Sequence, residues 1–237
     1  MLMDIFSSFD SYQFNSFSSF NKTINTMIIT MPLIILLMTM TSIWPSISRI
    51  PSIMIQPLYV MFEQNMRTKS KVLKGYSITT TSLFMIIIAL NLIGLIAYSF
   101  SITSHLIFTL IFGLPLWLTS VTSSIMNNKK EFVAHLLPSG APDWLNPFLV
   151  LIETISISVR PLTLSFRLAA NMTAGHIVLS LIGFYLSSAM LSYSVYPAIL
   201  MIVSMSYILF EVAICLIQAY IFCLLLTLYT DDHTSNH

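Results

Sequence analysis

The sequence predicts an all-α integral membrane protein with about five membrane-spanning helices. Of its 237 residues, 56% are hydrophobic and only 8% are charged, whereas charged residues make up about a quarter of a typical soluble domain. The mean hydropathy is +0.86. The apolar residues form blocks near the roughly 20 residues that a helix needs to cross a hydrocarbon core. We therefore expect one polytopic domain over residues 1–237, surrounded by membrane lipid.

The N-terminal part is predicted to contain one span and one surface segment. Residues 1–26 are polar and match neither a secretory signal nor an Arg-rich transit peptide. Residues 27–43 form the first span, which stops at Trp44 and Pro45, and a Trp suits the membrane interface. In residues 46–74 the apolar pattern weakens, prolines recur and basic residues gather. We expect this segment to lie on the membrane surface.

The middle of the chain, residues 78–126, is predicted to form a hairpin of two spans. The apolar blocks 78–100 and 106–126 are separated by only five residues, so the two helices should be antiparallel. A Pro/Gly-rich connector, residues 138–147, follows them.

Residues 148–230 are predicted to form a second, longer hairpin. Its two apolar segments run over residues 148–192 and 195–229. Both are longer than the roughly 20 residues of an upright span. Helices of this length fit a bilayer only when they are strongly tilted or bent. We therefore expect a slanted pair of long helices.

Basic residues indicate which helix ends share one side of the membrane. Positively charged loops favour the cytoplasmic or matrix side. Such residues follow the first and the third predicted spans: Arg67, Lys69, Lys71, Lys74, Lys129 and Lys130. With five spans, the C-terminus is expected on the same side as these basic loops, and the N-terminus on the opposite, outer side.

Several classes of function are disfavoured by the sequence. The net charge of +1 provides no global field for nucleic acid. We find no Gly-rich phosphate loop, no HExxH pair and no Cys/His cluster with metal spacing, so we expect no cofactor and no independent enzyme. Cys215 and Cys223 lie about 12 Å apart on one helix, too far for a disulfide, and are expected to pack or to face lipid.

Ionisable residues inside the last two apolar segments are the candidate functional residues. Such groups are costly at membrane depth and by default mark an ion or proton path. They are Glu153, Arg160, Arg167, His176 and Glu211. Near the start of its helix, the pair Glu153 and Arg160 can equally be explained by mutual pairing or by snorkelling to the interface.

Helical spacing places several of these residues on one face. Glu153, Arg160 and Arg167 are seven residues apart, and Asn171 follows four residues later. At about 100° per residue they form a stripe within about 40°. A polar stripe cannot face lipid, so it must face protein or water.

Distances along the helices predict two polar groups separated by Arg167. His176 lies about 13 Å beyond Arg167, and Glu211 lies about 10 Å from Gln218 on the antiparallel helix. Arg167 and Gln218 would then share one depth, with His176 and Glu211 toward the outer side. Toward the other side lie three acids: Glu153, Asp231 and Asp232. The arrangement predicts two half-channels separated by a fixed cation.

The residue types suit proton transfer. His and Glu exchange protons near ambient pH when burial or a neighbour shifts their pKa values. An Arg keeps its proton in proteins, so it blocks protons while it attracts a carboxylate. The sequence has no acid suited to be a moving carrier beside Arg167, which points to a carboxylate on another chain.

Several stretches resemble the a-subunit of F-type ATP synthases, over roughly residues 78–232. The most specific is Arg-Leu-x-x-Asn-x-x-Ala-Gly-His at residues 167–176. The similar runs are residues 114–117, 135–142, 152–156, 160–176 and 210–220. The first 77 residues match this family only loosely, and Ala169 stands where many relatives have Thr.

The resemblance implies a non-catalytic, proton-translocating stator subunit of the mitochondrial inner membrane, with its C-terminus in the matrix. Because residues 1–26 do not match a transit peptide, a mitochondrial protein of this sequence would be made inside the organelle. Its partners would be the rotating c-ring, other Fo stator subunits and lipid. Arg167 would face the c-ring carboxylate, and Asn171 and Gln218 would be its polar neighbours. His176 and Glu211 would form the outer half-channel, and Glu153 would be the exit acid on the matrix side.

Two other interpretations of the sequence remain open. A secondary transporter also buries charges at mid-membrane, but it normally has two related halves and helices broken at corresponding positions, which we do not find. A purely structural subunit would use the polar stripe only to dock a partner helix. Proton flux through a reconstituted complex distinguishes that interpretation from a proton path.

Overall fold

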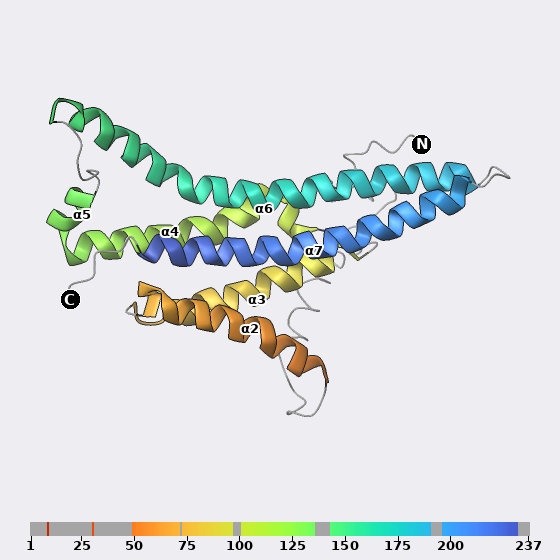
Figure 1. The fold of residues 1–237 in the computed structure, drawn as a ribbon, viewed down its shortest axis with the longest axis horizontal. Coiled ribbons are helices and arrows are strands. Elements are labelled where there is room, and N and C mark those ends of the chain that lie inside the picture. Colours follow the sequence, from red (N-terminus) through yellow and green to blue (C-terminus); the bar gives the residue numbers. More distant parts are fainter. Residues whose placement is uncertain are drawn as a thin grey trace, which may run out of the picture. The chain divides into compact units, whose positions relative to one another are not determined.

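The computed structural model describes residues 9, 30, 49–71, 73–96, 101–135, 143–190 and 196–231. These ranges contain helices and no β-strand (Figure 1), which confirms the predicted fold class. In chain order the elements are α2 (Arg49–Arg67), η3 (Lys69–Lys71), α3 (Tyr76–Gly94), η4 (Ile102–Ser104), α4 (Leu106–Asn127), α5 (Lys129–His135), η5 (Asp143–Leu145), α6 (Asn146–Met190) and α7 (Tyr196–Asp231).

Four of the described helices, α3, α4, α6 and α7, are long and apolar enough to cross a membrane. The bounds of α4, α6 and α7 agree with the predicted segments to within two residues. The first predicted span, residues 27–43, lies outside the described residues except for Thr30. The short helix α5 was not predicted.

Helix α3 ends at Gly94 rather than at residue 100. A Cβ placed on Gly94 would lie 3.3 Å from Cε of Met172 and 3.5 Å from Cβ of Ser101. Met172 and Ser101 thus lie close to the backbone at the glycine where the helix ends.

The chain divides into two compact units that each contain parts of several helices. We call Met1–Pro51, Ile86–His105 and Leu168–Ala219 the first unit, and Ser52–Met85, Leu106–Arg167 and Tyr220–His237 the second unit. Each unit contains one part of α6 and one part of α7, so the long hairpin contributes to both.

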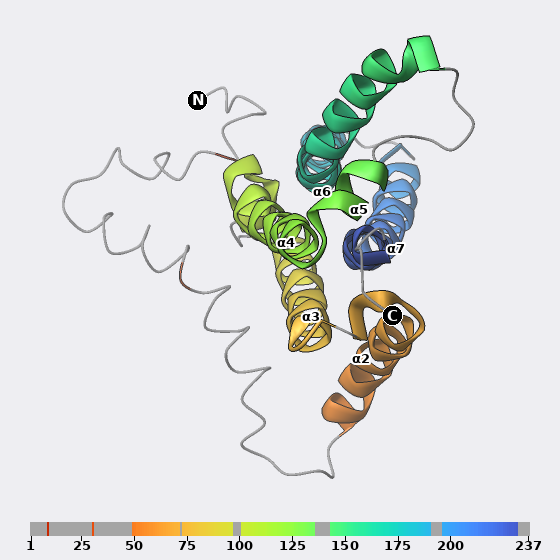
Figure 2. The ribbon, with the colours of Figure 1, turned by 90° about the vertical axis from the view of Figure 1, so that its left-hand side faces the viewer.

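Helix α2 is held to α3 by a buried hydrogen bond, and the residues that follow it are held to α7 by an exposed one, both in the second unit. The Asn65 side chain donates to Oγ1 of Thr80 at 3.0 Å. The backbone N–H of Lys69 donates to Oδ1 of Asp231 at 2.7 Å, where the C-terminal end of α2 lies beside the end of α7 (Figure 2). The predicted surface segment is therefore helical and is held to the end of the long hairpin.

Helix α4 packs closely on α6 and α7 in the second unit. Oγ1 of Thr109 donates to the Ser165 carbonyl at 3.2 Å. A Cβ on Gly113 would lie 3.6 Å from Leu164 and 3.7 Å from Phe222, ordinary van der Waals distances. Small side chains let membrane helices approach one another, because packing rather than water exclusion drives their association.

Hydroxyl groups in the spanning helices are satisfied mostly by their own helix. Ser120, Ser165 and Thr227 donate to carbonyls three residues earlier at 2.7, 2.9 and 2.8 Å. A buried hydroxyl without a partner would be costly in hydrocarbon. This back-bonding allows polar Ser and Thr to lie inside otherwise apolar helices.

Both cysteines are free and buried. Sγ of Cys215 lies 3.5 Å from Sδ of Met172, and Sγ of Cys223 lies 3.8 Å from the Thr80 carbonyl. Of the two predicted environments, packing inside the protein is therefore correct and lipid exposure is not.

We predict that Asn65→Ala destabilises the attachment of α2. Asn65 is fully buried, and removing its hydrogen bond to Thr80 should cost about 1–3 kcal/mol. Thermal unfolding of the assembled complex would measure the effect, with the exposed Asn127→Ala as the matched control. Equal midpoints for the two variants would contradict a stabilising role for Asn65.

Candidate functional site

A narrow cleft in the first unit brings together polar side chains from three helices. Its polar lining consists of Asn91 on α3, Asn171 on α6, and Glu211 and Gln218 on α7. The apolar lining consists of Leu168, Met172, Ile214 and Cys215. Three of the predicted site residues, Asn171, Glu211 and Gln218, therefore share one cleft.

Glu211 is a buried acid inside a spanning helix, with 3% of its surface exposed. Its carboxylate lies against the backbone of Gly175 on α6, where an added Cβ would overlap Oε1. Tyr207, one turn earlier on α7, interacts with the same carboxylate. Burying an acid in this setting is costly, so Glu211 is unsuited to a role in packing alone.

His176 directly follows the glycine that accommodates Glu211. Its ring packs edge-to-face with Phe9, with the two ring centres 6.2 Å apart. Its Nε2 atom is buried and has no hydrogen-bond partner among the described residues. Of the two predicted outer residues, Glu211 therefore lies against the residue that precedes His176 on α6.

Asn91 is a cleft residue that the sequence analysis missed. It is 1% exposed, its Nδ2 donates to the Cys215 carbonyl over a long 3.5 Å contact, and its Oδ1 has no partner within the described structure. The available signal was an amide in the middle of an apolar span, because such a group requires a polar partner. A search for charged residues alone does not find it.

Arg167 lies on the exposed side of α6 in the second unit. Its side chain is exposed, as are those of Thr163 and Phe166 nearby. It forms no ion pair with any residue that the structure describes. A cation in a spanning helix cannot face lipid, so this side of α6 requires water or another protein.

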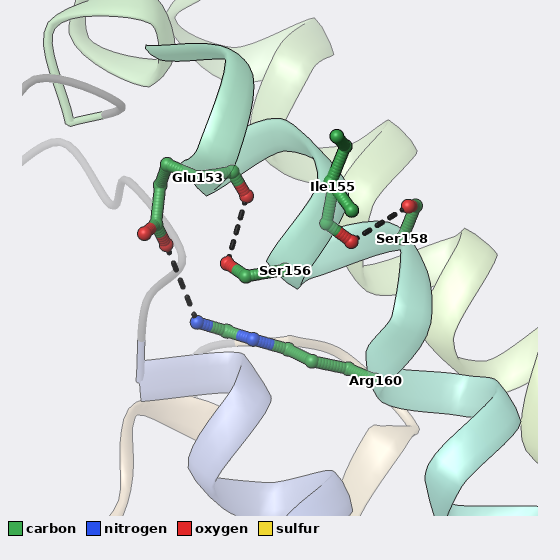
Figure 3. Close-up of polar contacts among 5 residues, drawn as sticks. All are labelled: Glu153, Ile155, Ser156, Ser158 and Arg160. Atoms are coloured by element: carbon green, nitrogen blue, oxygen red, sulfur yellow. Dashed lines mark hydrogen bonds and ion pairs between the residues drawn. The ribbon is translucent and has the colours of Figure 1, made fainter. Parts of the chain in front are cut away.

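The acids predicted at the inner end have different surroundings. Oε1 of Glu153 lies 3.7 Å from Nη2 of Arg160 (Figure 3), whereas Asp231 accepts the backbone N–H of Lys69. Asp232 lies outside the described residues. Within the described ranges, no group of three His, Cys, Asp or Glu side chains could hold a metal ion.

These features define a multi-pass helical membrane protein with ionisable groups in its spanning helices. A family model described as "ATP synthase A chain" matches residues 20–231. The chain is 36% identical over 233 residues to the ATP synthase F(0) complex subunit a of Pelomedusa subrufa, covering 94% of this chain and 98% of the relative. It is 35% identical over 232 residues to ATP synthase subunit a of Apis mellifera ligustica, covering 98% and 97% of the two chains.

A third relative, ATP synthase subunit a of Albinaria caerulea, is 46% identical over 153 residues, which cover 65% of this chain and 71% of the relative. The chain belongs to the ATP synthase subunit a family. The resemblance noted in the sequence is thereby confirmed.

We predict that Gly175→Ala displaces the Glu211 carboxylate and lowers the rate of ATP synthesis. The added methyl group would overlap the carboxylate, and overpacking of this kind costs about 1–3 kcal/mol. Gly183→Ala is the matched control, since Gly183 also lies in α6 and a Cβ placed on it would have no neighbouring atom within 4 Å. The rate of ATP synthesis per assembled complex is measured for both variants. Equal rates in the two variants would show that Gly175 does not position Glu211.

Proposed function

We propose that this chain is the proton-translocating stator subunit of a mitochondrial F-type ATP synthase. It provides two half-channels that load and unload carboxylates on the rotating c-ring, and so couples proton flow to rotary ATP synthesis. The chain itself is not catalytic, and the ATP chemistry belongs to other subunits. The single observation that carries the proposal is the Glu211 carboxylate, buried in a spanning helix within a cleft lined by three side-chain amides.

Protons reach the ring from the outer side through His176 and Glu211. Both side chains can accept and release a proton, and Glu211 lies against Gly175, the residue that precedes His176 on α6. Asn91, Asn171 and Gln218 line the same cleft. Their amides donate and accept hydrogen bonds without titrating, so they give the carboxylate polar surroundings and carry no proton themselves.

Arg167 forms the barrier between the two half-channels. Along α6 it lies between His176 and Glu153, and its fixed charge opposes direct passage of a proton. Its exposure and its lack of an ion pair with the described residues support a partner on another chain. A ring carboxylate supplies that partner, and its attraction to the cation favours loss of its proton.

Protons leave on the matrix side past Glu153, with Asp231 and Asp232 at the end of the chain. The basic side chains that define this side are exposed: Arg67, Lys69, Lys71, Lys74, Lys129 and Lys130. The positive-inside rule then places these loops and the C-terminus in the matrix. Lipid of the inner membrane and the other Fo stator subunits cover the remaining apolar faces.

We predict that Glu211→Gln lowers ATP synthesis by about a hundredfold, the lower range for loss of a proton-transfer group. The amide fits the same space but cannot accept and release a proton. Synthesis would be measured in reconstituted vesicles over a range of outer pH, with Glu63→Gln on α2 as the control. A purely structural role for Glu211 would leave the rate unchanged at every pH.

We predict that Arg167→Ala abolishes coupled synthesis and raises passive proton conductance, because the barrier between the half-channels is lost. Arg167→Lys should also impair synthesis, since an ammonium is more strongly hydrated and lacks the planar fork of a guanidinium. The exposed Arg67→Ala is the control. The two measurements are ATP synthesis and proton leak in membranes with equal amounts of assembled complex. Normal synthesis by Arg167→Ala would overturn the mechanism.

A further inference from the structure

The Arg160 side chain connects two helices in the second unit. Its Nη2 atom lies 3.7 Å from Oε1 of Glu153, two turns earlier on α6 (Figure 3). Its Cζ atom lies 5.3 Å from the centre of the Tyr229 ring, near the end of α7. A guanidinium within about 6 Å of a ring centre is attracted to the face of the ring. One cation therefore contacts an acid on its own helix and an aromatic ring on the neighbouring helix.

The contact between Glu153 and Arg160 is an ion pair without a hydrogen bond. Its length of 3.7 Å exceeds the range of about 2.7–3.2 Å for N–H···O bonds. The two side chains are 40% and 29% exposed, respectively, so water reaches both of them. Pairs of this kind contribute little to stability. The contact restricts where the carboxylate points but leaves its oxygens accessible.

Tyr229 limits the positions that the Arg160 guanidinium can adopt. A planar guanidinium can lie over an aromatic ring while its N–H groups still point toward a carboxylate, which a lysine ammonium does less well. The side chains of Glu153 and Arg160 point toward one another in Figure 3. The ring on α7 thus determines indirectly where the Glu153 carboxylate lies.

The last turn of α7 is itself held in place. The carboxylate of Asp231, two residues after Tyr229, accepts the Lys69 backbone N–H at 2.7 Å. The Tyr76 hydroxyl donates to the Leu226 carbonyl at 3.2 Å. These contacts fix the helical turn that contains Tyr229, so the position of the ring that Arg160 contacts is fixed as well.

We propose that Arg160 is a positioning residue for Glu153. The Tyr229 ring restricts the position of the guanidinium, and the guanidinium in turn keeps the Glu153 carboxylate on the side of α6 next to the end of α7. This inference rests on the proposed role of Glu153 as the exit acid. Arg160 itself carries no proton. It acts through Glu153, and its contribution therefore disappears when Glu153 can no longer exchange protons.

The test is ATP-driven proton pumping by assembled complexes, normalised to the amount of complex on native gels. We expect Arg160→Gln and Tyr229→Leu each to lower pumping about two- to fivefold, the factor that corresponds to one exposed cation–π contact. Arg160→Lys keeps the charge and should restore part of the rate. Tyr229→Phe keeps the ring face and should therefore pump faster than Tyr229→Leu.

The double variant separates positioning from a general structural effect. In a Glu153→Gln background, Arg160→Gln should cause no further loss, because the residue through which it acts is already inactive. If the double variant lost the product of the two single factors, the positioning role would be overturned. Normal pumping by both Arg160→Gln and Tyr229→Leu would overturn it as well. Normal pumping by Glu153→Gln alone would instead overturn the exit role of Glu153, and the inference with it.

Discussion

The cost of placing ionisable and polar groups in hydrocarbon governs the rest of this structure. Each such group inside a spanning helix needs protein or water around it. Glu211 lies against Gly175 in a cleft that three side-chain amides line. Hydroxyl groups bond to carbonyls of their own helix. Arg160 contacts both Glu153 and Tyr229. The pairing of α6 with α7 in each unit follows from this requirement as much as from apolar packing.

Arg167 and Glu211 meet the same constraint in opposite ways. Glu211 is enclosed within the first unit, whereas Arg167 is exposed and forms no ion pair with the described part of the chain. The proposed transfer of protons to a moving partner needs both arrangements. The acid must be shielded from lipid at all times, but the cation must remain available to each carboxylate that passes.

The sequence predicted the bounds of α4, α6 and α7 to within two residues, because these bounds follow from the length of apolar runs. It did not predict the contacts between helices. Three contacts depend on the register between helices. They are the close approach of Gly175 to Glu211, the place of Asn91 in the cleft, and the contact of Arg160 with the Tyr229 ring. Periodicity within one helix does not determine that register. The end of α3 at Gly94 was not predicted either, because the apolar run continues past it.

The central claim is that Glu211 exchanges protons with the outer side only. Infrared difference spectra of reconstituted complex, with the pH changed on one side at a time, would show the carboxyl band that disappears in Glu211→Gln. The account predicts that this band changes with the pH of the outer side and is insensitive to the pH of the matrix side. A band that followed the matrix pH, or both equally, would contradict the separation into two half-channels.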